Sequence, residues 1–478
     1  MPGHRNRGGT VATFAIVAVV AAGVLYLASL DWTTGHLSPL AIAILNIRIT
    51  DGIVPILSYV LVVASLIFLV VRRARRRWII VAAVGAVFGA GVAVVVLLVS
   101  ASANTFGVQL SQVTAIWGIA VFSAVGLAVS GFFSRGWMRK TGTAASIVIL
   151  IFAGIIGVNV DFGLNRTVGE FVGVSTERTV TIPVATPKPT PTATALVAGG
   201  ALWANWRPPA GMPAAGTTEQ VIIPNTISGF KARPAGLYLP PAALVANPPA
   251  LPLVIMMMGQ PGNPDPSFTA PVLDRFAARH HGLAPIVLVA DQIGNPAIDP
   301  FCLDTKMFGN SQTYLAKDVV GWARTHLHVL QDAAHWTIAG YSNGGECALQ
   351  LGVTHPQIWG NVLDISGEMY PGADKPAHTL ATAFGGNIAA YQATWPLGIL
   401  AKGTYPDTVG IFTVGSNDGK YRREAIAVNA AAIAAKWKTT YFEVPNGGHV
   451  LAALNGGLQE GYTILYPRLG LSDPATAP

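Results

Sequence analysis

Five long apolar stretches occupy the first third of this chain and constrain its fold more than any other feature. They cover residues 10–30, 52–71, 78–100, 114–133 and 144–160. Each is near the roughly 20 residues that a helix needs to cross the hydrocarbon core of a membrane. The first stretch alone would also suit a signal peptide, but four more follow it. The sequence therefore predicts a transmembrane region of about five helices over residues 1–160.

Basic residues between the stretches predict how the chain crosses the membrane. They lie before the first stretch, after the second and after the fourth: Arg5, Arg7, Arg72, Arg73, Arg75, Arg76, Arg77, Arg135, Arg139 and Lys140. The loops on the other side carry only Arg48 as a basic residue. Because cytoplasmic loops are enriched in Lys and Arg, the N-terminus is expected in the cytoplasm. Five spans then place everything after residue 160 outside it.

The net charge of +7 does not indicate a nucleic-acid partner, because the positive charges gather near the membrane. Before Asp161 there are eleven Lys and Arg against two acidic residues. From Asp161 onward there are nineteen Lys and Arg against twenty-one acidic residues. The basic excess therefore reflects membrane topology, and no nucleic-acid partner is expected.

Residues 161–216 are predicted to form an extracytoplasmic linker. Its centre alternates Pro and Thr between Ile182 and Thr194. Such a segment has too few backbone donors for a helix or a central strand, and it favours an extended, semi-rigid spacer.

Residues 217–478 change to short apolar runs that alternate with amphipathic segments. An antiparallel pair is expected at residues 219–224 and 235–239. Buried strands are expected at residues 251–258, 285–290, 336–339, 361–365, 410–414 and 440–444, and helices at 314–327 and 344–353. Strands that alternate with helices predict an α/β domain, with a mostly parallel sheet covered by helices on both faces.

The segment Gly340-Tyr-Ser342-Asn-Gly344 is a complete G-x-S-x-G motif. It follows a strand-like run and opens a predicted helix. A serine on such a sharp strand-to-helix turn has an exposed hydroxyl, as the nucleophile of an α/β-hydrolase requires. The sequence therefore predicts Ser342 as a catalytic nucleophile. Chance occurrence of the motif in a chain with 52 glycines is the alternative.

A nucleophilic serine needs a base and an orienting carboxylate, in the chain order Ser, Asp or Glu, His. His449 follows the last predicted strand and is the expected base. Asp418 follows the strand at residues 410–414 and is the expected acid. Asp364 and Asp407 are the competing acids.

The oxyanion of such a reaction needs two backbone N–H donors. One is expected from Asn343, directly after the nucleophile. The other is expected from the loop after the strand at residues 251–258, which reads Gly259-Gln-Pro-Gly262. Because Pro261 has no N–H, Gln260 is the expected donor. A simple Gly/Pro turn is the alternative interpretation of this loop.

The last 260 or so residues resemble the esterase D and antigen-85-type mycolyltransferase family of α/β-hydrolases. The resemblance rests on the following segments: the Gly259 loop, Tyr314-Leu315 with Asp318, Gly340 to Gly345, Ser366-Gly367, Phe384 to Gly386 with Tyr391 and Pro396, and the loops of Asp418 and His449. Asn343 and Met258 depart from it, since family members often have Met and His there. The resemblance implies a serine enzyme that cleaves or transfers acyl esters and uses no metal or cofactor.

The chain has two cysteines, Cys302 and Cys347. Outside the cytoplasm such a pair favours a disulfide, which would tie a long loop to the helix after Ser342. Two buried free thiols are the alternative. A metal site is not expected.

Together these features predict a serine esterase that is anchored in the cell membrane and acts outside the cytoplasm. Its position favours a lipid or cell-envelope ester as substrate, either a mycolyl-type ester or an aminoacylated phospholipid. The alternatives are an acyltransferase that uses an envelope acceptor, and a non-catalytic envelope protein on a degenerate hydrolase fold.

Overall fold

The computed structural model describes residues 38–71, 76–103, 110–133, 136–163, 165–172, 174, 176, 178–183 and 201–476. The chain forms two compact units, which divide at residues 176 and 177. The first predicted span, residues 10–30, lies outside the described residues, as does most of the Pro/Thr-rich centre of the linker. Each unit is considered by itself below.

Among its described residues, the N-terminal unit contains four helices that are long and apolar enough to cross a membrane. They are α3 (Ile53–Val70), α4 (Arg76–Ser102), α5 (Gln112–Val129), which continues as the 3₁₀ helix η1 (Ser130–Phe133), and α6 (Trp137–Phe162). Large apolar side chains cover their outer surface; Val87 and Phe88, for example, are each 72% exposed. Such a surface is suited to contact with lipid rather than water.

These four helices confirm four of the five predicted apolar helices. The last one differs in length, since α6 begins at Trp137 rather than at residue 144. Hydropathy marks only the apolar part of a helix, whereas the backbone hydrogen bonds continue through Arg139 and Lys140, both good helix formers. The described part of this unit also contains the short helices α2 (Pro39–Leu45) and α7 (Val168–Phe171).

The C-terminal unit is built on an eight-stranded sheet with the order β1-β2-β4-β3-β7-β8-β9-β10. β2 pairs antiparallel with β1 and with β4, and all other neighbours are parallel. The strands are β1 (Thr217–Val221), β2 (Ala235–Leu239), β3 (Leu253–Met257), β4 (Ile286–Val289), β7 (Trp336–Tyr341), β8 (Asn361–Ile365), β9 (Val409–Gly415) and β10 (Lys438–Val444). The predicted α/β architecture is confirmed.

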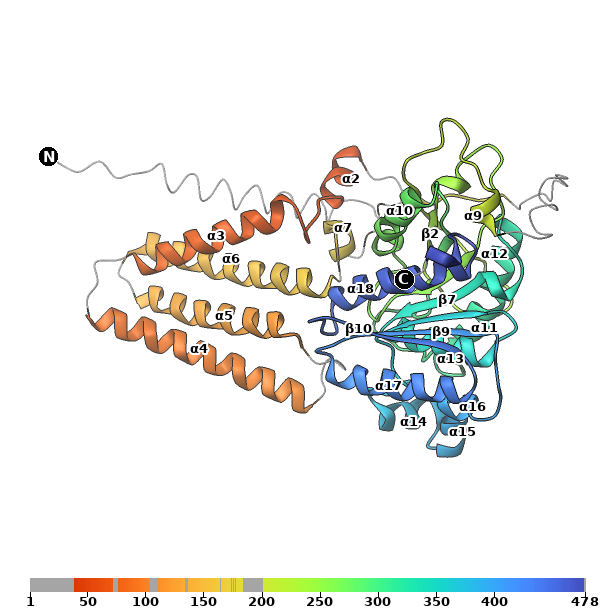
Figure 1. The fold of residues 1–478 in the computed structure, drawn as a ribbon. Helices are drawn as coiled ribbons and strands as arrows, with labels where there is room; N and C mark the ends of the chain where they lie inside the picture. The colour runs from red at the N-terminus through yellow and green to blue at the C-terminus, as the bar shows by residue number, and fades with distance from the viewer. Residues whose placement is uncertain are drawn as a thin grey trace. The chain divides into compact units, whose positions relative to one another are not determined.

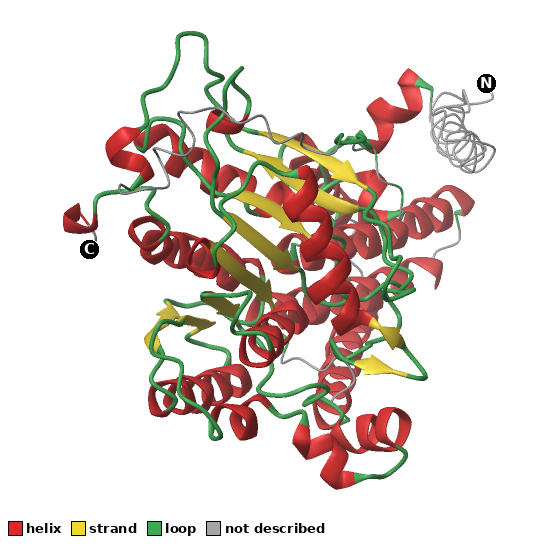
Figure 2. Ribbon diagram, turned by 90° about the vertical axis from the view of Figure 1, so that its right-hand side faces the viewer, coloured by secondary structure: helices red, strands yellow, loops and turns green. Residues whose placement is uncertain are grey.

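Helices cover both faces of this sheet (Figures 1 and 2). α10 (Ala270–Arg279) and α18 (Leu451–Arg468) lie on one face, and α13 (Asn343–Thr354) and α17 (Gly419–Ala434) lie on the other. The remaining elements are α9 (Leu202–Asn205), α11 (Ser311–Thr313), the π-helix η4 (Tyr314–Val319), α12 (Val320–His326), α14 (Pro376–Phe384), α15 (Ile388–Ala393), α16 (Pro396–Leu400), the two-residue strands β5 (Asp304–Thr305) and β6 (Gly309–Asn310), and the short 3₁₀ turns η2 (Pro241–Ala243), η3 (Pro266–Phe268), η5 (Ala333–His335) and η6 (Pro474–Thr476).

Three strands of the sheet are buried along their whole length, and their residues do not alternate between polar and apolar. All residues of β3, β8 and β9 are buried. Helices on both faces exclude water from such strands, so alternation of polar and apolar residues is lost. The carboxyl ends of β7, β9 and β10 meet at one edge of the sheet, and parallel α/β sheets bind ligands at this edge.

Candidate active site

Ser342 lies on a sharp turn between β7 and α13. Its backbone has φ 56° and ψ −120°, and it is the N-cap of α13. Non-glycine residues rarely adopt positive φ, and the surrounding structure must impose it. Ser342 N–H donates to Ile365 O at 2.9 Å, which ties the turn to β8. The residue is partly exposed. The local geometry is that of a nucleophile elbow.

The structure brings Ser342, His449 and Asp418 together, although they follow three different strands. His449 Nε2 lies 2.7 Å from Ser342 Oγ, and His449 Nδ1 lies 2.7 Å from Asp418 Oδ2. Asp418 is 1% exposed and His449 is 4% exposed. A carboxylate on Nδ1 fixes the imidazole tautomer that leaves Nε2 free to accept the serine proton.

Two tyrosine rings hold the His449 imidazole in place. The ring of Tyr421 stacks on it with a centroid distance of 4.0 Å, and the ring of Tyr341 with 5.4 Å. Neither tyrosine was singled out from the sequence, because their contacts with His449 arise only when β7, β10 and α17 meet.

The two competing acids lie elsewhere. Asp364 is buried and its Oδ1 accepts the N–H of Gly367 at 2.8 Å. Asp407 is exposed at the other end of β9, two residues before Val409. Geometry therefore favours Asp418 as the acid.

The segments expected to bind an oxyanion lie beside the nucleophile. Asn343 is the first residue of α13, where backbone N–H groups are not used within the helix. A methyl group on Gly259 would lie only 3.1 Å from Ser342 Cβ, so this loop passes directly next to the serine. The N–H groups of Gln260 and Asn343 remain the predicted oxyanion donors.

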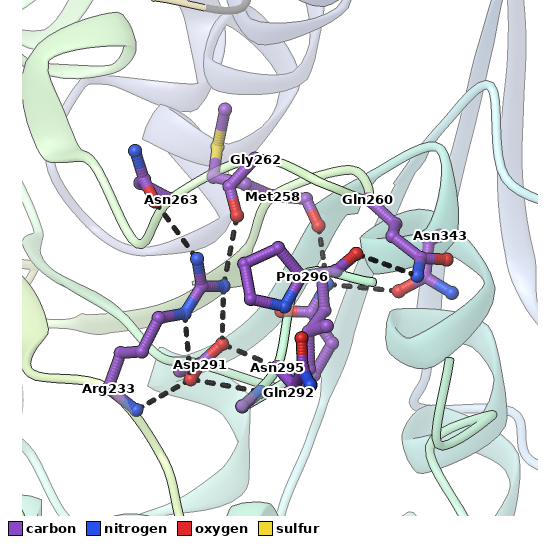
Figure 3. A network of polar contacts seen from close by, with 12 residues as sticks. Arg233, Met258, Gln260, Gly262, Asn263, Asp291, Gln292, Asn295, Pro296 and Asn343 are labelled. Carbon is purple, nitrogen blue, oxygen red and sulfur yellow. Dashed lines mark hydrogen bonds and ion pairs between the residues drawn. The ribbon is translucent and has the colours of Figure 1, made fainter. Parts of the chain in front are cut away.

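One glutamine connects these two segments (Figure 3). Gln292 Nε2 donates to Met258 O at 2.5 Å and to Asn343 Oδ1 at 3.0 Å. It is 2% exposed, so both hydrogen bonds are shielded from water. The contacts fix the end of β3 relative to the residue that follows the nucleophile.

An ion pair holds the other end of the Gly259 loop (Figure 3). Arg233 Nη2 lies 2.7 Å from Oδ1 of Asp291, whose side chain is fully buried. The same guanidinium donates to Gly262 O at 3.0 Å and to Asn263 Oδ1 at 2.9 Å. The sequence did not identify Arg233, Asp291 or Gln292. Their partners lie far away along the chain, and no local motif marks such contacts.

Cys302 and Cys347 form a disulfide with a Cα–Cα distance of 5.4 Å. Both residues are buried, and Cys347 lies in the second turn of α13. The bond closes a loop of 45 residues and ties the segment around Cys302 to the nucleophile helix.

Removing this disulfide is expected to destabilise the domain. For a loop of this length the loss of chain entropy in the unfolded state corresponds to about 4 kcal/mol. In a domain of this size, such a loss lowers Tm by roughly 10 °C. Thermal unfolding of wild type with and without reductant measures the effect. A Cys302→Ala/Cys347→Ala variant, which has no bond to reduce, is the control. A wild-type Tm that does not respond to reductant would contradict the prediction.

Comparison with known proteins shows what the C-terminal unit is similar to. Residues 232–444 match the family model named Esterase. A protein of Corynebacterium glutamicum, described as uncharacterized, is 34% identical over 270 residues, which are 54% of this chain and 62% of the relative. The chain thus spans less than two thirds of the length of this curated relative.

Similar solved structures include a ferulic acid esterase, which is 17% identical and has a TM-score of 0.44. An S-formylglutathione hydrolase from Agrobacterium tumefaciens is 16% identical with a TM-score of 0.45. Each comparison covers 54% of this chain and 97% of the other. A fluorophosphonate-binding serine hydrolase of Staphylococcus aureus is 13% identical with a TM-score of 0.41, covering 54% of this chain and all of the other.

Proposed function

We propose, from the esterase-family domain at residues 232–444, that this chain is a membrane-anchored serine esterase acting outside the cytoplasm on a lipid or cell-envelope ester. The observation that carries the proposal is the chain of contacts from Ser342 through His449 to Asp418, with both distances at 2.7 Å. A serine, a base and a buried acid in this order suit acyl transfer through a covalent intermediate.

In the proposed reaction, Ser342 Oγ attacks the ester carbonyl carbon while His449 Nε2 takes the serine proton. The N–H groups of Gln260 and Asn343 stabilise the negative oxygen that forms. The tetrahedral intermediate collapses, the C–O bond of the ester breaks, and His449 returns the proton to the leaving alcohol. Water then attacks the acyl-enzyme with His449 again as base, which releases the acid and restores Ser342. Asp418 stabilises the imidazolium in both steps.

The anchor and the orientation rest on the apolar helices and the basic loops. Four described helices are suited to crossing a membrane. Together with the apolar residues 10–30 they make an odd number of spans, which supports a catalytic unit on the side opposite the N-terminus. A unit held at the outer face would meet lipids and envelope components before soluble esters.

A fluorophosphonate probe that does not cross membranes tests both parts of the proposal on intact cells. Wild type is expected to label, and Ser342→Ala is expected not to label. Labelling of wild type only after lysis would show that the orientation is wrong. Wild type that stays unlabelled even after lysis would overturn the esterase proposal itself.

A further inference from the structure

Three carboxyl groups border the catalytic residues, each from a different segment of the C-terminal unit. They belong to Asp299, Glu346 and Glu368 and are called the carboxyl cluster below. Glu346 lies in the first turn of α13, four residues after Ser342. Its carboxyl group lies within 4.8 Å of the sulfur atoms of the Cys302–Cys347 disulfide, which joins α13 to the segment that carries Asp299.

The other two members contact the catalytic machinery. The side chain of Asn343, the residue after the nucleophile, lies close enough to the Asp299 carboxylate to lower its pKa. Glu368 Oε1 accepts a hydrogen bond of 3.4 Å from Tyr421. Tyr421 is the residue whose ring stacks on His449 at 4.0 Å. As a whole residue Asp299 is half-buried, whereas Glu346 and Glu368 are buried.

Glu346 is the most unusual member, because it is buried without a partner. The residue is 1% exposed, and neither carboxyl oxygen has a hydrogen-bond partner among the described residues. A buried carboxyl group without a hydrogen bond is costly, and such groups are normally paired. An acceptor held in this state next to a nucleophile points to a donor that arrives with the substrate.

A cation would relieve the repulsion among the three carboxyl groups. Burial raises the pKa of Glu346 well above its usual range, and repulsion from Asp299 and Glu368 raises it further. Burial likewise raises the pKa of Asp299 to about 6 and that of Glu368 to about 8. Lys375 and Lys420 lower the pKa of Asp299 and Glu368 respectively, and among the described residues no basic group acts on Glu346 in this way.

We propose that the carboxyl cluster binds the protonated amino group of an amine-bearing acyl group, so that the preferred substrates are aminoacyl-type esters. This inference rests on the proposed esterase function and adds its substrate class. It selects the aminoacyl ester over the uncharged mycolyl-type ester.

An ammonium group fits this arrangement better than a metal ion does. It offers three N–H donors, one for each carboxyl group of the cluster. In an aminoacyl ester it is bonded to the carbon next to the carbonyl, so it must lie close to Ser342. Glu346 follows Ser342 by one helical turn, and Glu368 contacts Tyr421 beside His449. Among the described residues, the group with metal-ligand spacing is Glu346 with Cys302 and Cys347, and both sulfur atoms are already bonded to each other.

The test compares two esters with the same leaving group, the p-nitrophenyl esters of alanine and of propionate, with the full-length chain in detergent. At pH 7 an α-amino group is mostly protonated, so the substrates differ by one positive charge. Wild type is expected to prefer the alanyl ester in kcat/KM by about 10- to 100-fold, as expected for a hydrogen bond to a charged group. Glu346→Gln keeps the shape of the side chain and is expected to remove most of that preference.

Two further variants make the outcome decisive. Asp299→Asn is expected to reduce the preference for the alanyl ester as well. Its side chain can still accept the hydrogen bond from Phe301 N–H, which is 2.7 Å long in the wild type. Glu443→Gln removes an acid that pairs with Arg422 at the surface and should leave the preference unchanged. Three results would overturn the proposal. They are equal kcat/KM of wild type on both esters, an equal loss of kcat/KM on both esters in Glu346→Gln, and a loss of activity on both esters after chelation with EDTA. Hydrolysis of the propionyl ester would still support the esterase function in each case.

Discussion

Asp418→Asn is expected to lower kcat for a soluble chromogenic ester by about 10⁴-fold without unfolding the domain. Asp418 Oδ2 accepts a hydrogen bond of 2.7 Å from His449 Nδ1–H, and the acid is buried. An asparagine amide would donate a hydrogen bond to Nδ1 instead. The imidazole would then carry its proton on Nε2, where it can no longer take the proton of Ser342.

The competing acids provide matched controls for this experiment. In Asp364→Asn the new side chain can still accept the hydrogen bond from Gly367 N–H, so the domain is expected to fold and keep most of its activity. Asp407→Asn changes an exposed residue and should have no effect. Circular dichroism of all three variants verifies folding. If Asp364→Asn caused the large loss and Asp418→Asn did not, the assigned acid would be wrong.

Most strands of the C-terminal unit could be located from the sequence, because each coincides with a short apolar segment. Strands such as β8 (Asn361–Ile365) and β2 (Ala235–Leu239) match the predicted residues, since a buried strand reads as a mainly apolar segment between turns. The type of a helix leaves no such signal in the sequence. The π-helix η4 (Tyr314–Val319) lies within the helix expected at residues 314–327, and its wider turns have no compositional mark.

The candidate site was predictable where a local motif carries the chemistry, as at Ser342, or where chain order restricts the choice, as at Asp418 and His449. Gln292 and Asp299 were not predictable, because their roles depend on where the loop after β4 lies against α13. Glu346 did leave a signal, namely an acidic residue in an otherwise small and apolar helix start. Its meaning needs the structure, which shows that the carboxyl group is buried without a partner.

Gly340→Ala is expected to reduce activity by about 10²-fold or more and to destabilise the domain. A Cβ atom at Gly340 would lie 1.8 Å from the carbonyl oxygen of Gly344 and 2.1 Å from its carbon. These are backbone atoms of the same turn, so the clash cannot be relieved by a side-chain rotation. The turn that carries Ser342 would have to move, and a displacement of about 1 Å in a catalytic group is enough for a loss of this size. Steady-state kinetics and thermal unfolding measure the two effects.

Gly321→Ala is the matched control, because it makes the same chemical change where there is room. Gly321 lies in α12, and no atom is within 4 Å of the position that its Cβ would take. Alanine in a helix interior is more favourable than glycine by about 0.5–1 kcal/mol, so this variant is expected to be slightly more stable and fully active. If Gly340→Ala retained wild-type activity, the turn around Ser342 would be more tolerant than its geometry indicates, and the requirement for glycine in the G-x-S-x-G motif would need a different explanation.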